Sequence, residues 1–317
     1  MKATGLHMLI KTYLAIILLM AFGGGLSPAS GLAGGSEKIP VIASILPLAD
    51  FCRQVGGERV DVQVLIPPGA SPHVFEPPPS VMTKAFQARV FVYVGAGLEP
   101  WASKILHSRE PGKVAVVEAA QGIPLIGEIG EHAAEQSQEK EHLGHRHEAG
   151  NPHIWLDPVL AQDICRRIAA ALIRVDPGHR FFYEARLGDY LTELAALDRD
   201  IMEQVKTWRI RGFISFHPAF SYFARRYGLK EMGVMELAPG REPTPRHLQE
   251  IVAAIRNYGF RVVFAEPQLN PRVAQVVARE AGVKVLMLDP LGGRPLYGDD
   301  YLKLMRYNLA TMEEAMK

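Results

Sequence analysis

Short apolar runs of β-branched residues alternate with helical patterns along most of this 317-residue chain, and this alternation constrains its fold. Runs such as 89–95 and 261–266 are almost continuously apolar, which is typical of parallel strands buried on both faces. Both halves repeat the order, so we predict an α/β fold of two lobes, each a mainly parallel sheet flanked by helices. The expected strands cover residues 39–46, 60–66, 89–95, 114–118, 212–217, 234–237, 261–266 and 283–289. The expected helices between them cover residues 48–55, 80–88, 248–258 and 271–281.

A long helical pattern separates the two halves. Asp157-Pro158 reads as an N-cap followed by proline at the first helical position, and it opens a helix that ends near Val175. Asp176-Pro177 opens a second helix whose apolar residues keep helical spacing for about thirty residues, or roughly 45 Å. A helix of this length is the natural connector of the lobes. We therefore expect an N-terminal lobe at 36–175, one long connecting helix at 176–208 and a C-terminal lobe at 209–317.

The first 35 residues have the features of a secretory signal peptide. Lys2 and Lys11 precede the apolar run 13–22, and small residues and turn formers follow it. The apolar run is short for a membrane span of about 20 residues, which favours cleavage, between 29 and 36, over an uncleaved anchor. The cleavage zone holds no cysteine, so we expect no lipid-modified N-terminus and a periplasmic location.

Composition and charge exclude several classes of partner. The chain is 48% hydrophobic and 22% charged with a formal net charge of +1, which gives no reason to expect nucleic acid or an anionic membrane as partner. Its two cysteines, Cys52 and Cys165, are too few for a thiolate cluster or a disulfide framework. In an exported protein they either pair with each other or stay as buried thiols.

Three histidines stand next to a proline, at Pro72-His73, Pro152-His153 and His217-Pro218, and a carboxylate follows in Asp289-Pro290. Proline restricts its neighbour to extended or turn geometry, so these side chains lie where strands or helices give way to loops. Three imidazoles and one carboxylate form a donor set that zinc favours. We predict a metal site between the lobes.

Four protein ligands suit holding a metal, whereas a hydrolytic zinc site keeps one position open for water. The sequence contains no His-Glu-x-x-His motif, and we assign no catalytic residue. A single histidine at a strand end is more often a hydrogen-bonding residue than a ligand. Glu76, Glu242 and Glu266 precede prolines and are expected to orient loops.

The segment 128–148 holds six glutamates, four histidines and no aromatic residue, so it cannot bury enough apolar area to offset the entropy of ordering. We interpret it as a surface loop near the mouth of the metal site. A solvated charged face is the alternative to weak accessory metal binding by its histidines, which are His132, His142, His145 and His147.

The stretches 69–80, 151–158 and 215–220 resemble the metal-binding motifs of the zinc and manganese solute-binding proteins of bacterial ABC importers, the ZnuA/TroA-like (cluster A-I) family. Their sequences are GASPHVFEPPPS, NPHIWLDP and SFHPAF. The stretches 240–245, 264–268 and 288–292 support the resemblance, which covers the chain from about residue 39.

The resemblance implies a ligand set of His73, His153, His217 and Asp289, and two α/β lobes joined by a long helix. A histidine at position 217 and a histidine- and glutamate-rich insertion are similar to the zinc branch of the family. The implied function is an exported, monomeric carrier that delivers Zn²⁺ to an ABC membrane permease with its ATPase. The alternatives are a manganese or iron carrier of the same family, a zinc-dependent hydrolase with Asp289 as base, and a surface adhesin or structural zinc protein.

Overall fold

The structure of the protein is a computed structural model that describes residues 37–107, 114–127, 150–237, 240 and 242–317. Its N-terminal half contains one parallel sheet of four strands. Its elements are β1 (Ile39–Ala43), α2 (Leu46–Gly56), β2 (Val60–Val64), α3 (Pro79–Ala85), β3 (Val90–Tyr93), α4 (Ala102–His107) and β4 (Ala115–Glu118). The strand order is β2-β1-β3-β4, and every pair is parallel. All four residues of β3 are buried, as expected for the central part of a covered parallel sheet.

The C-terminal half repeats the alternation of strands and helices. Its elements are β5 (Gly212–Ser215), α7 (Ser221–Tyr227), β6 (Lys230–Val234), α8 (Pro245–Tyr258), β7 (Val262–Ala265), α9 (Arg272–Ala281), β8 (Lys284–Met287) and α10 (Tyr301–Met316). β5 pairs with β6 and β7 pairs with β8, both in parallel, and β5 packs beside β7. The α/β class with parallel strands in both halves is therefore confirmed.

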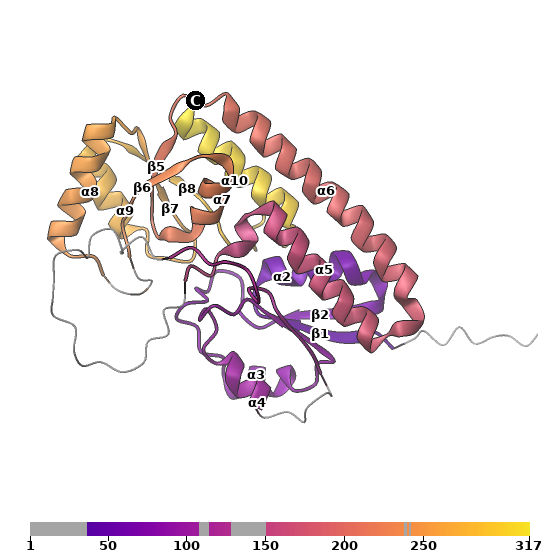
Figure 1. The fold of residues 1–317 in the computed structure, drawn as a ribbon. Helices are drawn as coiled ribbons and strands as arrows, with labels where there is room; N and C mark the ends of the chain where they lie inside the picture. The colour runs from indigo at the N-terminus through magenta and orange to yellow at the C-terminus, as the bar shows by residue number, and fades with distance from the viewer. Residues whose placement is uncertain (1–36, 108–113, 128–149, 238–239, 241) are drawn as a thin grey trace, which may run out of the picture. The chain divides into compact units, whose positions relative to one another are not determined.

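Two helices, α5 (Pro158–Val175) and α6 (Arg180–Lys206), lead from the first half to the second (Figure 1). The Asp157 carboxylate caps α5 by accepting a hydrogen bond of 2.8 Å from the backbone N of Val159. α6 has 27 residues and is roughly 40 Å long. It packs against α2 and α5 of the first half and against α7 and α10 of the second, which confirms one long connecting helix.

The two halves share buried contacts as well as this helix, and residues 38–317 form one compact unit. The indole N–H of Trp155 donates to the carbonyl oxygen of Pro290 at 2.7 Å. The hydroxyl of Tyr301, at the start of α10, donates to the carbonyl oxygen of Trp155 at 2.7 Å. Trp155 and Tyr301 belong to a hydrophobic core that runs through both halves, while a second, smaller core lies around β5, β7, α8 and α9.

The structure departs from the sequence-based expectations at several elements. The strand expected at 234–237 lies at 230–234. The sequence did not indicate a strand there because Glu231 is polar, and the structure shows that this carboxylate accepts hydrogen bonds from two serine hydroxyls. The second linker helix begins at Arg180, not at Pro177, since residues 177–179 form a 3-10 turn. The helices α4, α7 and α10 were not expected.

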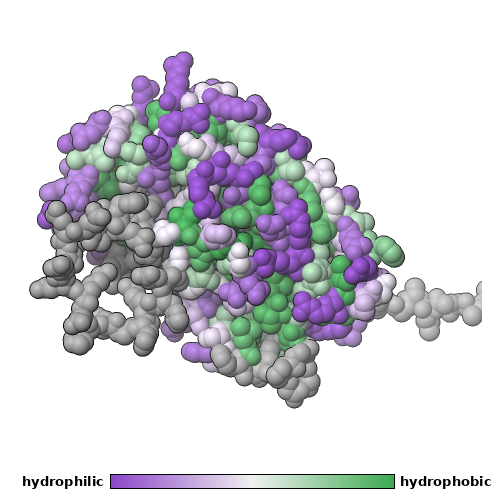
Figure 2. Space-filling view, in the orientation of Figure 1, coloured by the Kyte–Doolittle hydropathy of each residue, from purple (hydrophilic) through white to green (hydrophobic). Residues whose placement is uncertain are grey.

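Three further features concern the cysteines, the hydropathy of the surface and the possibility of a membrane-spanning helix. Both cysteines are buried and free. Figure 2 shows hydrophilic residues spread over the visible face with apolar residues between them. Among the described residues, no helix combines the length and apolar character needed to cross a membrane.

Candidate metal centre

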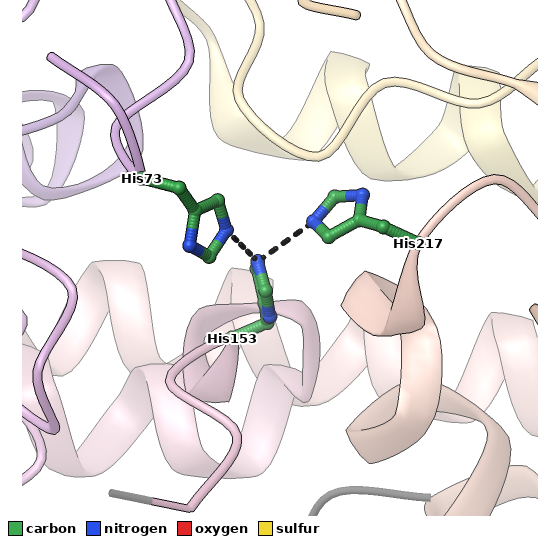
Figure 3. A group of neighbouring side chains, drawn as sticks. All are labelled: His73, His153 and His217. Carbon is green, nitrogen blue, oxygen red and sulfur yellow. Dashed lines mark hydrogen bonds between the residues drawn. The ribbon is translucent and has the colours of Figure 1, made fainter. Parts of the chain in front are cut away.

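Three of the predicted ligands, His73, His153 and His217, meet in the structure (Figure 3). The Nε2 atom of His153 lies 3.1 Å from Nε2 of His73 and 3.1 Å from Nε2 of His217. Within the part of the chain that the structure describes, this is the one group of three or more possible ligand side chains whose donor atoms all lie within 4.8 Å of one another. The sequence thus identified three side chains that the fold brings together.

Each histidine comes from a different segment of the chain. His73 lies in the loop that follows β2. His153 follows Pro152 and precedes the 3-10 turn that leads into α5. His217 follows β5 and has extended geometry, with φ −132° and ψ 167°, as is usual for the residue before a proline. His73 and His153 therefore belong to the first half and His217 to the second.

Asn151 fixes the orientation of the His153 ring. Its side-chain oxygen lies 2.8 Å from His153 Nδ1 and also accepts the backbone N–H of His153 at 2.9 Å. The amide nitrogen of Asn151 donates to the carbonyl oxygen of Pro218, which settles which end of the amide faces the ring. His153 Nδ1 must therefore carry the proton, and the neutral ring presents an unprotonated Nε2 to the cluster.

Glu266 has the same effect on His217. Its Oε1 lies 2.6 Å from His217 Nδ1 and accepts the backbone N–H of His217 at 3.2 Å. Both side chains are buried. A carboxylate only accepts hydrogen bonds, so Nδ1 of His217 is protonated and its Nε2 faces the other two rings. Sequence reasoning assigned Glu266 to loop orientation, and the structure shows that it orients a histidine.

The electrostatics of the three rings differ. Burial, with a smaller contribution from His217, lowers the pKa of His73 to about 3. Burial and the neighbouring imidazoles hold the pKa of His153 well below 6.5. Burial also acts to lower the pKa of His217, but the charge and hydrogen bond of Glu266 outweigh it and raise that pKa above 6.5.

The convergence of these nitrogens fits a metal ion. When all three rings are neutral, Nε2 of His153 and Nε2 of His217 are both acceptors 3.1 Å apart, and no proton joins them. Tetrahedral zinc with Zn–N bonds of about 2.0–2.1 Å places its ligand nitrogens about 3.3 Å from one another. The rings also border a small cavity with about 10 Å³ of room for the centre of a water-sized sphere. One bare cation fits this space and satisfies the facing nitrogens.

Asp289, the fourth predicted ligand, lies outside this group of three. Its side chain is fully buried in the loop after β8. Its Oδ1 accepts the backbone N–H groups of Leu291 at 2.9 Å and Gly292 at 3.0 Å. Oδ1 also accepts from the amide of Gln268 at 2.7 Å, and Oδ2 accepts from the hydroxyl of Tyr297. Both carboxylate oxygens are therefore already hydrogen-bonded.

Two polar residues of the site, Asn151 and Gln268, were not singled out from the sequence. Both stand close to a recognised feature, because Asn151 precedes His153 by two positions and Gln268 follows Glu266 in Glu-Pro-Gln. For Gln268 the available signal was its place just after the carboxyl end of β7, and for Asn151 it was the nearby His153. The histidines predicted as accessory ligands in the segment 128–148 lie outside the described residues.

Comparison with known proteins gives consistent matches over almost the whole chain. The sequence model of the family described as zinc-uptake complex component A, periplasmic, matches residues 41–315. The chain is 30% identical over 312 residues to the high-affinity zinc uptake system protein ZnuA of Bacillus subtilis, covering 95% of each chain. It is also 30% identical over 285 residues to the zinc-binding protein AdcA of Streptococcus pyogenes, covering 87% of this chain and 55% of that protein. A crystal structure of ZnuA superposes with a TM-score of 0.77 at 29% identity, covering 89% of this chain and all of the other.

Proposed function

The chain belongs to the family of the periplasmic component A of zinc-uptake complexes, and on that premise we propose that it captures Zn²⁺ between its two halves and delivers it to an ABC permease. Members of this family are solute-binding transport proteins. We propose His73, His153 and His217 as the ligands that hold the ion. The convergence of their Nε2 atoms, with Nδ1 of two rings already hydrogen-bonded, is the observation on which this ligand set rests.

The donor set favours zinc over manganese. Imidazole nitrogens suit zinc, whereas manganese prefers carboxylate, carbonyl and water oxygens. His217, the third of the proposed ligands, supplies a nitrogen atom. A manganese or iron carrier would replace part of this set with oxygen ligands.

Metal binding links the two halves directly. His73 and His153 come from the first half and His217 from the second, so one ion can bind all three only when the two halves are close together. A bound ion therefore favours this closed arrangement over one in which the halves are farther apart. The core and the long helix shared by the halves limit how far they separate. We propose the boundaries 36–175, 176–208 and 209–317 for the two lobes and their connector.

The remaining assignments concern export and partners. We propose that residues 1–35 direct export and are removed, and that the mature protein acts as a monomer in the periplasm. Its partner is an ABC membrane permease with its ATPase. The segment 128–148 supplies weaker accessory zinc sites through its histidines.

Metal analysis and titration of the mature protein test this function. Protein purified without chelator should carry zinc, and competition between Zn²⁺ and Mn²⁺ should show one tight zinc site per chain. His153→Ala or His217→Ala should remove that site, while His247→Ala, which alters a histidine on α8, should leave it intact. Tight binding that survives both ligand substitutions would contradict the ligand set. Ester or phosphate turnover by the zinc-loaded protein would instead indicate a hydrolase.

A further inference from the structure

Gln268 borders the same cavity as the three histidines and carries a buried amide oxygen without a hydrogen-bond partner in the described part of the chain. It lies in the loop that follows β7, two positions after Glu266. Its amide nitrogen donates to Asp289 Oδ1 at 2.7 Å. Its amide oxygen, Oε1, is buried, and no hydrogen-bond donor among the described residues reaches it. Burying an amide oxygen without a partner is unfavourable, so this atom lacks a group that donates to it or binds it.

Asp289 determines which end of the Gln268 amide stays free. A carboxylate accepts hydrogen bonds and cannot donate them, so it selects the NH₂ end of the amide. Asp289 itself is held by the backbone N–H groups of Leu291 and Gly292 and by the hydroxyl of Tyr297. The oxygen of Gln268 is therefore kept on the side away from Asp289.

Glu266 cannot fill the fourth position while it orients His217. Its Oε1 is bound to Nδ1, and the metal would lie at Nε2 on the opposite side of the ring. With a metal–nitrogen bond of about 2.0–2.1 Å, Oε1 would be about 6 Å from the ion. Oε2 of Glu266 is also buried without a hydrogen-bond partner within the described ranges, but it would still lie roughly 4 Å or more from the ion, which is too far for a bond. The cavity has room for about one small sphere, so once an ion occupies it, the fourth donor has to be a lining atom.

We propose that Oε1 of Gln268 is the fourth donor to the metal bound by the three histidines, and that Asp289 is a positioning residue that holds this amide. This assignment rests on the proposed zinc-binding function. In this arrangement neither carboxylate contacts the metal, and each is hydrogen-bonded to a ligand: Glu266 to His217 and Asp289 to Gln268. Their charges offset that of the cation. A neutral amide oxygen is a weaker donor than a carboxylate, which suits a carrier that has to release its ion.

Chelator competition with Zn²⁺ and the visible absorption of the Co²⁺-loaded protein test this assignment. Gln268→Ala should lower zinc affinity about 10–100-fold, as does the loss of other groups around a metal site. It should also change the cobalt spectrum, because water replaces the amide oxygen. The matched control is Gln54→Ala, since Gln54 also donates its amide to an aspartate, Asp50, at 3.2 Å but lies in α2.

Asp289→Asn separates a positioning residue from a direct ligand. Leu291, Gly292 and Gln268 all donate to Oδ1 of Asp289, so the oxygen of the new amide takes that position and Gln268 keeps its orientation, while the new NH₂ group faces the hydroxyl of Tyr297. Affinity should then fall much less than in Gln268→Ala, and adding Asp289→Asn to Gln268→Ala should have little further effect. A further large loss in the double variant would identify Asp289 as the ligand and overturn the proposal.

Two other results would also overturn it. Unchanged zinc affinity in Gln268→Ala is one, and lowered affinity with an unchanged cobalt spectrum is the other. His153→Ala distinguishes these failures from failure of the proposed function, because loss of tight zinc binding in that variant supports the three-histidine site whatever Gln268 does.

Discussion

Glu266 and His217 form a buried pair in which the carboxylate lies 2.6 Å from Nδ1 of the ring. The pair has two effects on one imidazole. It fixes the tautomer that presents Nε2 to the other histidines, and it raises the pKa of His217 although burial acts to lower it. If this ring binds a cation as proposed, the strength of that binding depends on a residue that does not touch the cation.

Glu266→Gln should weaken zinc binding while leaving the ligand set in place. The amide oxygen still accepts from Nδ1, but the negative charge that raises the basicity of the ring is lost, so affinity should fall about 10–100-fold. In the metal-free protein, NMR titration should show the pKa of His217 falling below its wild-type value. Glu250→Gln is the control, since Glu250 pairs with Arg246 on the exposed face of α8. Equal zinc affinity in the wild type and in Glu266→Gln would contradict this role.

Zinc affinity should decrease as the pH falls through the raised pKa of His217. Protonated His217 carries a proton on Nε2, so the metal has to displace it, and affinity should drop about tenfold per pH unit below that pKa. His73, with a pKa of about 3, and His153, whose pKa is also lowered, stay neutral in this range. Chelator competition between pH 5 and 8 measures the slope. A slope of two or three protons per zinc would show that more than one ring is protonated.

The sequence predicted the three histidines better than the groups that orient them. Proline neighbours and the family motifs marked His73, His153 and His217. The roles of Glu266 and Gln268 depend on which atoms face them across the space between β5, β7 and the loop after β8, and residue spacing does not encode those contacts. Asp289 resembles a ligand by its motif, yet its carboxylate is held by two backbone N–H groups of its own loop.

The fold shows a similar contrast. Parallel strands and the long helix α6 follow from apolar runs and from helical spacing that persists over many turns. α10 also had a signal, because Asp300 caps it by accepting the backbone N–H of Lys303 at 2.9 Å. The strand β6 was misplaced because Glu231 is polar, and only the fold shows that Ser215 and Ser221 donate to it.

Asp50 should make the folded state less stable as the pH rises from about 4 to about 6. Burial raises its pKa to about 6, although it accepts the backbone N–H of Tyr301 at 3.0 Å and the amide of Gln54. The folded state thus binds the proton more tightly than the unfolded state. Its stabilising contribution is complete below the unfolded pKa and is lost as the pH passes the folded one, by up to about 3 kcal/mol. Urea unfolding of Asp50→Asn should lack this decline, and an unchanged pH dependence would contradict the assignment.

Deleting residues 131–148 should remove weak zinc sites and leave the tight site intact. The segment contains His132, His142, His145 and His147, and its density of histidine and glutamate is the reason to expect accessory binding. The contacts that orient His153 and His217 come from Asn151 and Glu266, which lie outside this segment. Calorimetric titration should therefore show the stoichiometry falling toward one zinc per chain with the affinity of the tight site preserved. Loss of the tight site on deletion would place part of the metal centre in this segment, and unchanged stoichiometry would mean that its histidines do not bind zinc.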